Sequence, residues 1–94
     1  MSSELLPPMT LVFYTDAGHG WLKVEKALFD KHRVEISCYS YQDKFNYYLE
    51  EDCDAPRFTD ELERYYRVII KHEYLDEYPC FIRQLPRSGV RGYL

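Results

Sequence analysis

The chain has 94 residues and a mass of 11.4 kDa, which suits one small domain rather than two. It is 46% hydrophobic, and its ten tyrosines and five phenylalanines can fill a core, which argues against a disordered chain. No apolar stretch approaches the roughly 18 residues that a membrane-spanning helix needs. The N-terminal residues lack the features of a secretory signal, and three cysteines do not fit a disulfide framework. We therefore expect a cytoplasmic protein without a membrane partner.

Charge is distributed unevenly along the chain. Lysine and arginine number 12 against 16 acidic residues, giving a net charge of −4, which argues against a duplex-binding domain. Seven acids lie between Glu50 and Glu63, with Arg57 as the single base. Arginines follow near the C-terminus, at positions 83, 87 and 91. This polarity indicates either a solvated acidic face or an acidic surface that meets a basic partner.

The first part of the chain predicts a strand, a turn and a helix. Residues 1–9 read as a flexible leader, because the prolines at positions 7 and 8 lack the N–H that a strand or helix uses. Residues 10–15 are rich in β-branched and aromatic side chains, which favours a strand, and the glycines in 16–20 favour a sharp turn. Residues 21–24 then pair back on this strand or lead into a helix over 25–32.

The middle of the chain predicts a β-hairpin. Residues 34–41 alternate, with Val34, Ile36 and Cys38 on one side, so that Cys38 is expected to be a small buried residue. After a polar stretch, residues 45–49 resume the alternation. Two such runs separated by a few residues are typical of antiparallel partners.

The remaining residues predict a second helix and further strands. Asp54 before Ala55-Pro56 reads as an N-cap, and apolar residues at helical spacing predict a helix over 55–66. Residues 68–75 switch to the period of a strand, and residues 80–83 predict a last short edge segment. The whole order predicts an α+β fold: a single domain over 10–85, with an antiparallel or mixed sheet, two helices on one face and a basic flexible tail over 86–94.

The sequence carries no recognised catalytic or metal-binding pattern. The three cysteines and three histidines are not clustered at the spacing of a zinc site, and the acidic run lacks the calcium-binding spacing of an EF-hand. No hydrolase signature is present. We therefore predict no catalytic residue, no metal and no cofactor.

The most unusual string is Asp16-Ala-Gly-His-Gly-Trp21. Asp16 and His19 on a glycine turn, beside Trp21, can form an acid/base pair or hold a ligand anion on exposed N–H groups. They can equally be parts of an ordinary turn, because the string matches no known phosphate loop.

Four strings resemble a group of small uncharacterised proteins carried by bacteriophages, prophages and plasmids. These strings are Asp16–Val24, Ile36–Tyr41, Tyr48–Asp54 and Phe81–Arg83, in the same order. The resemblance implies a mobile-element accessory protein in the cytoplasm of a bacterial host. It implies no assigned activity and therefore no catalytic residue.

We hypothesise a non-enzymatic protein that binds a host or phage protein through an acidic, tyrosine-rich surface. A nucleic-acid-handling or defence complex is a suitable target, as for anti-CRISPR-type inhibitors. The expected contact residues are Glu50, Glu51, Asp52, Asp54, Asp60, Glu61, Tyr39 and Tyr41. Self-association into a homodimer is left open.

Two alternatives remain. The first is a small ligand-binding domain or enzyme that uses the Asp16–His19 turn together with Tyr39 or Tyr41. The second is a DNA-binding regulator that uses the arginines at positions 83, 87 and 91.

Overall fold

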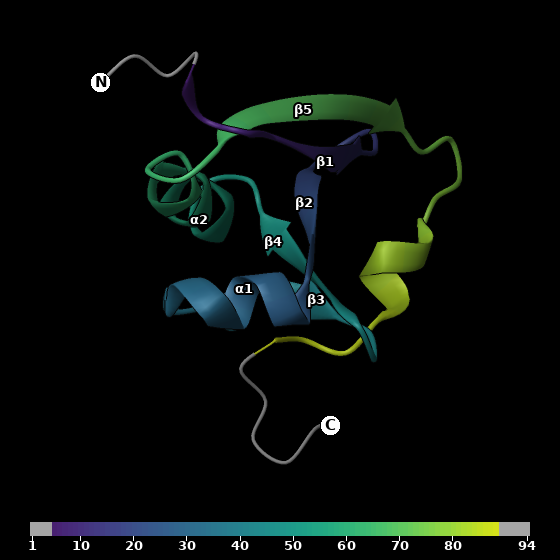
Figure 1. Ribbon diagram of the computed structural model, residues 1–94. Coiled ribbons are helices and arrows are strands. Elements are labelled where there is room, and N and C mark those ends of the chain that lie inside the picture. The colour runs from purple at the N-terminus through teal and green to yellow at the C-terminus, as the bar shows by residue number, and fades with distance from the viewer. Residues whose placement is uncertain (1–4, 89–94) are drawn as a thin grey trace.

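The computed structural model describes residues 5–88 and contains a five-stranded mixed sheet with two α-helices (Figure 1). The strands lie in the spatial order β3-β4-β2-β1-β5. The elements, in chain order, are β1 (Pro8–Thr15), β2 (Gly20–Glu25), α1 (Lys26–His32), β3 (Tyr41–Gln42), β4 (Asn46–Glu50), α2 (Asp54–Leu62), β5 (Arg67–Tyr74) and the 3-10 helix η2 (Phe81–Gln84). No helix within residues 5–88 is long and apolar enough to cross a membrane.

Strand pairing confirms the predicted α+β class with a mixed sheet. β2 runs antiparallel to both β1 and β4, and β3 runs antiparallel to β4. The return of the chain from α2 to β5 makes the one parallel pair of this sheet, between β1 and β5. Residues 16–19 form the predicted turn, and residues 21–24 pair back on the first strand as expected.

Both helices pack on the same face of the sheet, as predicted. Alternation along the strands places Leu22 and Val24 of β2 on this face, beside Leu49 of β4. Phe29 of α1 and Phe58 of α2 stack on each other over them, with ring centroids 5.2 Å apart. The helix face therefore holds the main hydrophobic core.

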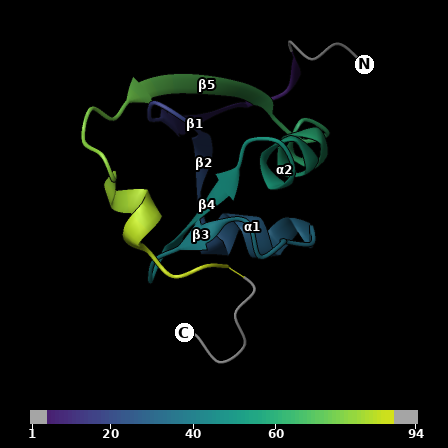
Figure 2. The same ribbon diagram turned by 180° about the vertical axis from the view of Figure 1, so that it is seen from behind.

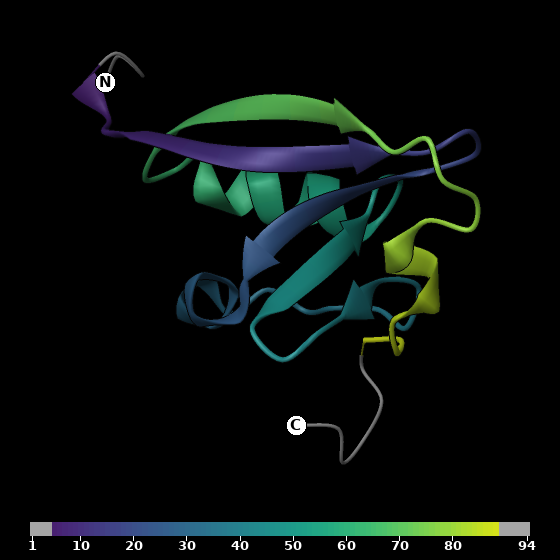
Figure 3. The same ribbon diagram turned by 90° about the vertical axis from the view of Figure 1, so that its right-hand side faces the viewer.

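The opposite face carries a second cluster, built around Trp21 and Tyr48. Ile82 of η2 and Cys80 are buried against these rings, so η2 covers this part of the sheet. Figures 2 and 3 show the segment after η2 running beside β3. Its carbonyl at Pro86 accepts the N–H of Gln42 at 2.9 Å.

The predicted strand over 34–41 is wrong: of this run only Tyr41 belongs to a strand, the two-residue β3. The backbone N–H of Ser37 bonds to the carboxylate of Asp54 instead of a neighbouring strand. Residues 34–40 therefore form a loop that is held at the first residue of α2, Asp54. Cys38, expected to be buried, is exposed on this loop.

Three element boundaries also differ from the prediction. β1 begins at Pro8 rather than at residue 10. Proline lacks an N–H but keeps a carbonyl that can accept a hydrogen bond, and the carbonyl of Pro7 accepts the N–H of Arg67. α2 ends at Leu62, whose carbonyl accepts two N–H groups of the following turn, and Asp54 lies inside the helix with Cys53 as the N-cap. Residues 81–84 form η2 instead of an edge strand.

Two predicted segments reach beyond the described residues. Of the leader, residues 1–4 lie outside them, and of the tail, residues 89–94 do. Arg87 and Ser88, which we assigned to the tail, bond to the loop before β3 and to β3 itself.

Candidate functional site

A hollow of about 440 Å³ opens beside the second cluster, on the side of the sheet away from the helices. Its volume falls in the range of roughly 300–1,000 Å³ typical of small-ligand pockets. It is lined by His19, Trp21, Tyr39, Tyr41, Glu50, Asp52, Cys53, Arg83 and Arg87.

Asp16 fixes the turn at one end of this hollow. Its Oδ1 accepts the N–H groups of Gly18 and His19, both at 2.9 Å, so the side chain itself closes the turn. Arg83 donates from Nε to Oδ2 at 2.6 Å and from Nη2 to Oδ1 at 3.1 Å. The hydrogen bond from Arg83 is the largest of the effects that hold the pKa of Asp16 well below its usual range. Both carboxylate oxygens of Asp16 are therefore engaged in hydrogen bonds that hold the turn against Arg83.

Two arginines lie against the aromatic wall of the hollow. The Arg83 guanidinium lies 5.2 Å from the ring centroid of Trp21 and 5.4 Å from that of Tyr78. Arg87 lies 4.4 Å from the ring centroid of Tyr41 and donates from Nη1 to the carbonyl of Tyr39 at 2.9 Å. These contacts place positive charge over aromatic faces. They also engage two of the arginines that a DNA-binding regulator would use; the third, at position 91, lies outside the described residues.

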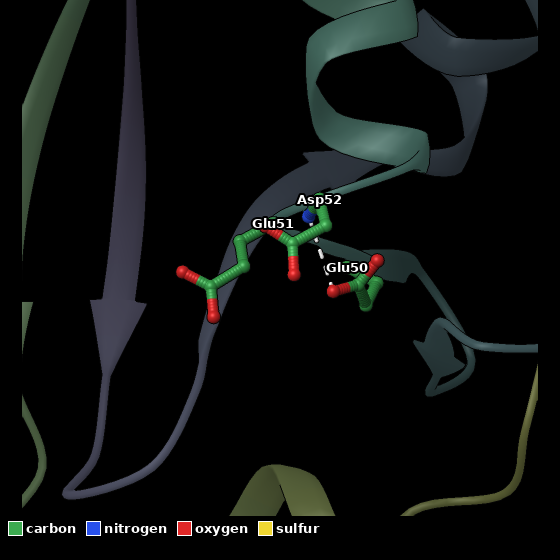
Figure 4. A group of neighbouring side chains, drawn as sticks. All are labelled: Glu50, Glu51 and Asp52. Atoms are coloured by element: carbon green, nitrogen blue, oxygen red, sulfur yellow. Dashed lines mark hydrogen bonds between the residues drawn. The ribbon is translucent and has the colours of Figure 1, made fainter.

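Three acidic side chains lie close together, Glu50 at the end of β4, then Glu51 and Asp52 (Figure 4), and of these Glu50 and Asp52 form an acidic wall of the hollow. One oxygen of each lies within 4.8 Å of the others. Glu50 accepts the backbone N–H of Asp52 at 3.1 Å, and Glu51 accepts that of Gly20 at 3.1 Å. Among residues 5–88 this is the group whose ligand atoms lie close enough to share a cation, but surface acids commonly cluster without one. We assign no metal to it.

The other predicted acidic residues lie elsewhere. Asp54 is buried, and its carboxylate accepts from the hydroxyls of Ser37 and Ser40 at 2.7 and 2.5 Å. Asp60 is exposed on α2. Glu61 pairs with Arg64 at 3.1 Å and lies 4.0 Å from His32. The expected acidic surface therefore divides: Glu50 and Asp52 line the hollow, and Glu51 lies beside them without lining it.

The hollow brings together residues that the sequence placed in separate hypotheses. Tyr39 and Tyr41, expected to contact a partner, line it with His19 and Trp21 of the expected ligand turn. Eight of the nine lining residues belong to the four strings quoted in the sequence. Cys53 and Arg83 were not expected to line a site. The one feature of the sequence that could have indicated it is that both belong to the four quoted strings.

Arg87 lies outside the four strings and was assigned to the tail. No local pattern links it to Tyr41, since a single antiparallel bridge between these two residues joins segments far apart in sequence.

No family model, curated protein or solved structure matches the chain.

Proposed function

We propose that the protein acts by binding, and that it holds a basic segment of a partner protein in this hollow. The observation that carries the proposal is the placement of Glu50 and Asp52 in one concave site with Tyr39 and Tyr41. Carboxylates attract a lysine or arginine side chain, and tyrosines supply contact area with a polar tip. A concave site gives both kinds of contact to one inserted side chain.

The acidic wall has spare hydrogen-bonding capacity for such a guest. Each carboxylate can accept several hydrogen bonds, and Glu50 accepts one within the described chain, from Asp52. A guanidinium can bridge two acceptors with its planar fork, which makes an arginine a better guest than a lysine. Because the carboxylates of Glu50, Glu51 and Asp52 lie close together and repel one another, a cation beside Glu50 and Asp52 also relieves this repulsion.

The biological setting that we propose is a phage or mobile-element accessory protein in a bacterial cell. Proteins that handle nucleic acids carry basic grooves, because they must neutralise phosphate charges. An arginine or lysine of such a groove can meet Glu50 and Asp52 on one side of the hollow, and binding there would block the groove. The proposed target is therefore a nucleic-acid-handling or defence complex of the host.

The test uses a defined probe, an arginine-rich peptide, titrated against the protein by calorimetry. Replacing both lining acids, as Glu50→Gln with Asp52→Asn, removes two negative charges while keeping side-chain shape. We expect about tenfold weaker binding, since two partly exposed charge pairs contribute on the order of 1.4 kcal/mol together. The same peptide made with glutamate in place of arginine should not bind.

A matched control distinguishes the hollow from net charge. Asp60→Asn with Glu63→Gln makes the same change of charge at two exposed positions on or next to α2. This control should keep the affinity of the unmodified protein at physiological salt, because exposed charges beyond about 8 Å are largely screened. If both double variants lose equal affinity, the hollow is not the site.

A second function, small-ligand binding, is favoured by one further observation. The hollow contains Trp21, the single tryptophan of the chain, next to His19 at a ring-centroid distance of 6.2 Å. A small molecule in the hollow should therefore change tryptophan emission directly. A screen of planar aromatic fragments read by this emission tests the idea, and saturable changes that vanish in Tyr41→Ala would support it.

A further inference from the structure

The outer edge of β5 is a second candidate interaction surface, remote from the hollow. β5 ends the strand order of the sheet and pairs with β1 along its full length, Arg67–Tyr74 (Figures 1 and 3). Within residues 5–88, no other strand pairs with β5. A strand of this length leaves a row of backbone groups at its free edge, ready to pair with another strand.

The hydrogen bonds to β1 fix which backbone groups point outward. Arg67 donates its N–H to the carbonyl of Pro7, and Leu75 donates to that of Thr15. Because successive residues of a strand point their N–H and C=O groups to alternate sides, the odd-numbered residues face β1. The outward groups therefore belong to Val68, Ile70, His72 and Tyr74.

The side chains of β5 favour a second copy of the same strand as the occupant. Consider two copies of β5 that pair antiparallel about a two-fold axis at Ile70. The outward N–H and C=O groups of Ile70 in one copy then bond to those of Ile70 in the other copy. The same register places Arg67 opposite Glu73 of the second copy, and this favourable charge pair occurs twice. If the axis lies at residue 69 instead, Arg67 of one copy lies opposite Lys71 of the other. If it lies at residue 71, the two Lys71 side chains lie opposite each other. Both shifts place like charges together.

The apolar residues of β5 support the same occupant. Val68 and Ile70 pack against the helix-side core but remain partly exposed, and Ile69 is half-buried on the other face. No proline or bulge interrupts the strand, so this edge lacks two of the devices that usually prevent pairing. A second copy would cover part of the surface that Val68, Ile69 and Ile70 still expose.

We propose that the protein forms a two-fold dimer in which β5 pairs antiparallel with β5 of a second copy, centred on Ile70. The two sheets then join into one continuous sheet. This inference does not depend on the proposed function, because β5 contributes no residue to the hollow.

Analytical ultracentrifugation across micromolar to near-millimolar concentrations tests the proposal. The unmodified protein should shift towards twice its 11.4 kDa mass. Arg67→Glu alone and Glu73→Arg alone each put like charges opposite one another and should weaken dimerisation about tenfold. The double variant, with the charges exchanged, should restore it. A monomer at every concentration, or a double variant as weak as the single ones, would overturn the proposal.

A cysteine experiment tests the register separately. In a background with Cys38→Ser and Cys53→Ser, Ile70→Cys places two thiols opposite each other, with Cα atoms about 5.5 Å apart, which a disulfide can span. Oxidation should therefore give a covalent dimer. His72→Cys, whose outward backbone faces residue 68 in this register, should not cross-link. Cross-linking at residue 72 instead of 70 would show that the proposed centre is wrong. Near-equal thermal midpoints of the two variants confirm that both remain folded.

Discussion

At the scale of single residues, the pair of Asp16 and Arg83 joins two segments that are far apart in sequence. Asp16 closes the turn before β2, and Arg83 belongs to η2. The Asp16 side chain is almost completely buried, and that of Arg83 is 21% exposed, so the pair is shielded from most solvent screening. The turn, η2 and the Trp21 wall of the hollow therefore depend on one ion pair.

Arg83→Met should destabilise the protein by about 2–3 kcal/mol, since it leaves a buried carboxylate without its charged partner. Methionine keeps much of the packing on Trp21, so the loss reports the charge rather than the volume. Urea denaturation measures it. Arg87→Met is the matched control, because no carboxylate within residues 5–88 forms a salt bridge with Arg87. An equal loss in both variants would contradict this assignment.

Acid should unfold the protein partly through Asp16. The folded state lowers the pKa of this carboxyl, so its stabilising contribution is complete above the unfolded pKa, near 4. The contribution decreases as the pH falls below that value towards the folded pKa. Asp16→Asn should therefore reduce the slope of stability against pH below about pH 4. The slope should not vanish, because hydrogen bonds from Tyr48 and Asn46 also lower the pKa of Asp43 despite its burial. An unchanged slope would show that Asp16 is not a main acid-sensitive group.

At the scale of elements, the loop over residues 34–40 shows why alternation alone misleads. Apolar residues at every second position predicted a strand, but a strand also needs a neighbour for its backbone groups. Here the buried carboxylate of Asp54 receives the N–H of Ser37 and the hydroxyls of Ser37 and Ser40. Ser40 in turn accepts the N–H of Glu50 through its hydroxyl. Side-chain partners distant in sequence decide this segment, and no local pattern reveals them.

Where local patterns and packing agree, the sequence predicts the elements well. Helical spacing located α2, which buries Phe58 and Leu62 in the helix-side core, and period two located β5, which packs Val68 and Ile70 against the same core. The hollow was predictable only in pieces. Its tyrosines, acids and turn were each recognised, but their meeting depends on η2 and on Arg87, which long-range contacts position.

Asp54→Ala should release this loop. The change removes the acceptor of the Ser37 N–H and leaves the Ser40 hydroxyl without its acid partner in the interior, so we expect a loss of about 2–4 kcal/mol. Chemical denaturation measures the loss, and hydrogen exchange should show faster exchange of the Ser37 amide. Asp52→Ala is the control, because this neighbouring side chain is exposed. Equal losses in the two variants would contradict an anchoring role for Asp54.

At the scale of the whole molecule, the sheet separates two clusters that are closed by different parts of the chain. The two helices close the main core, whereas η2 and the segment after it close the cluster around Trp21. Residues 86–88 therefore support the hollow without contributing to the main core. Stability should differ between the two faces, because the second cluster depends on one short helix and a single β-bridge.

Ending the chain after Leu85 should open the hollow and leave the main core folded. The truncation removes the carbonyl of Pro86 that receives the Gln42 N–H, and it removes Arg87 from the ring of Tyr41. We expect faster exchange of the Gln42 amide and a red shift of Trp21 emission as water reaches its ring. The amides of Leu22 and Val24 should keep their protection, since both side chains lie in the main core. Hydrogen exchange followed by nuclear magnetic resonance measures both groups in one experiment. If exchange accelerates equally at all these amides, the two faces unfold as one unit and the hollow has no separate stability.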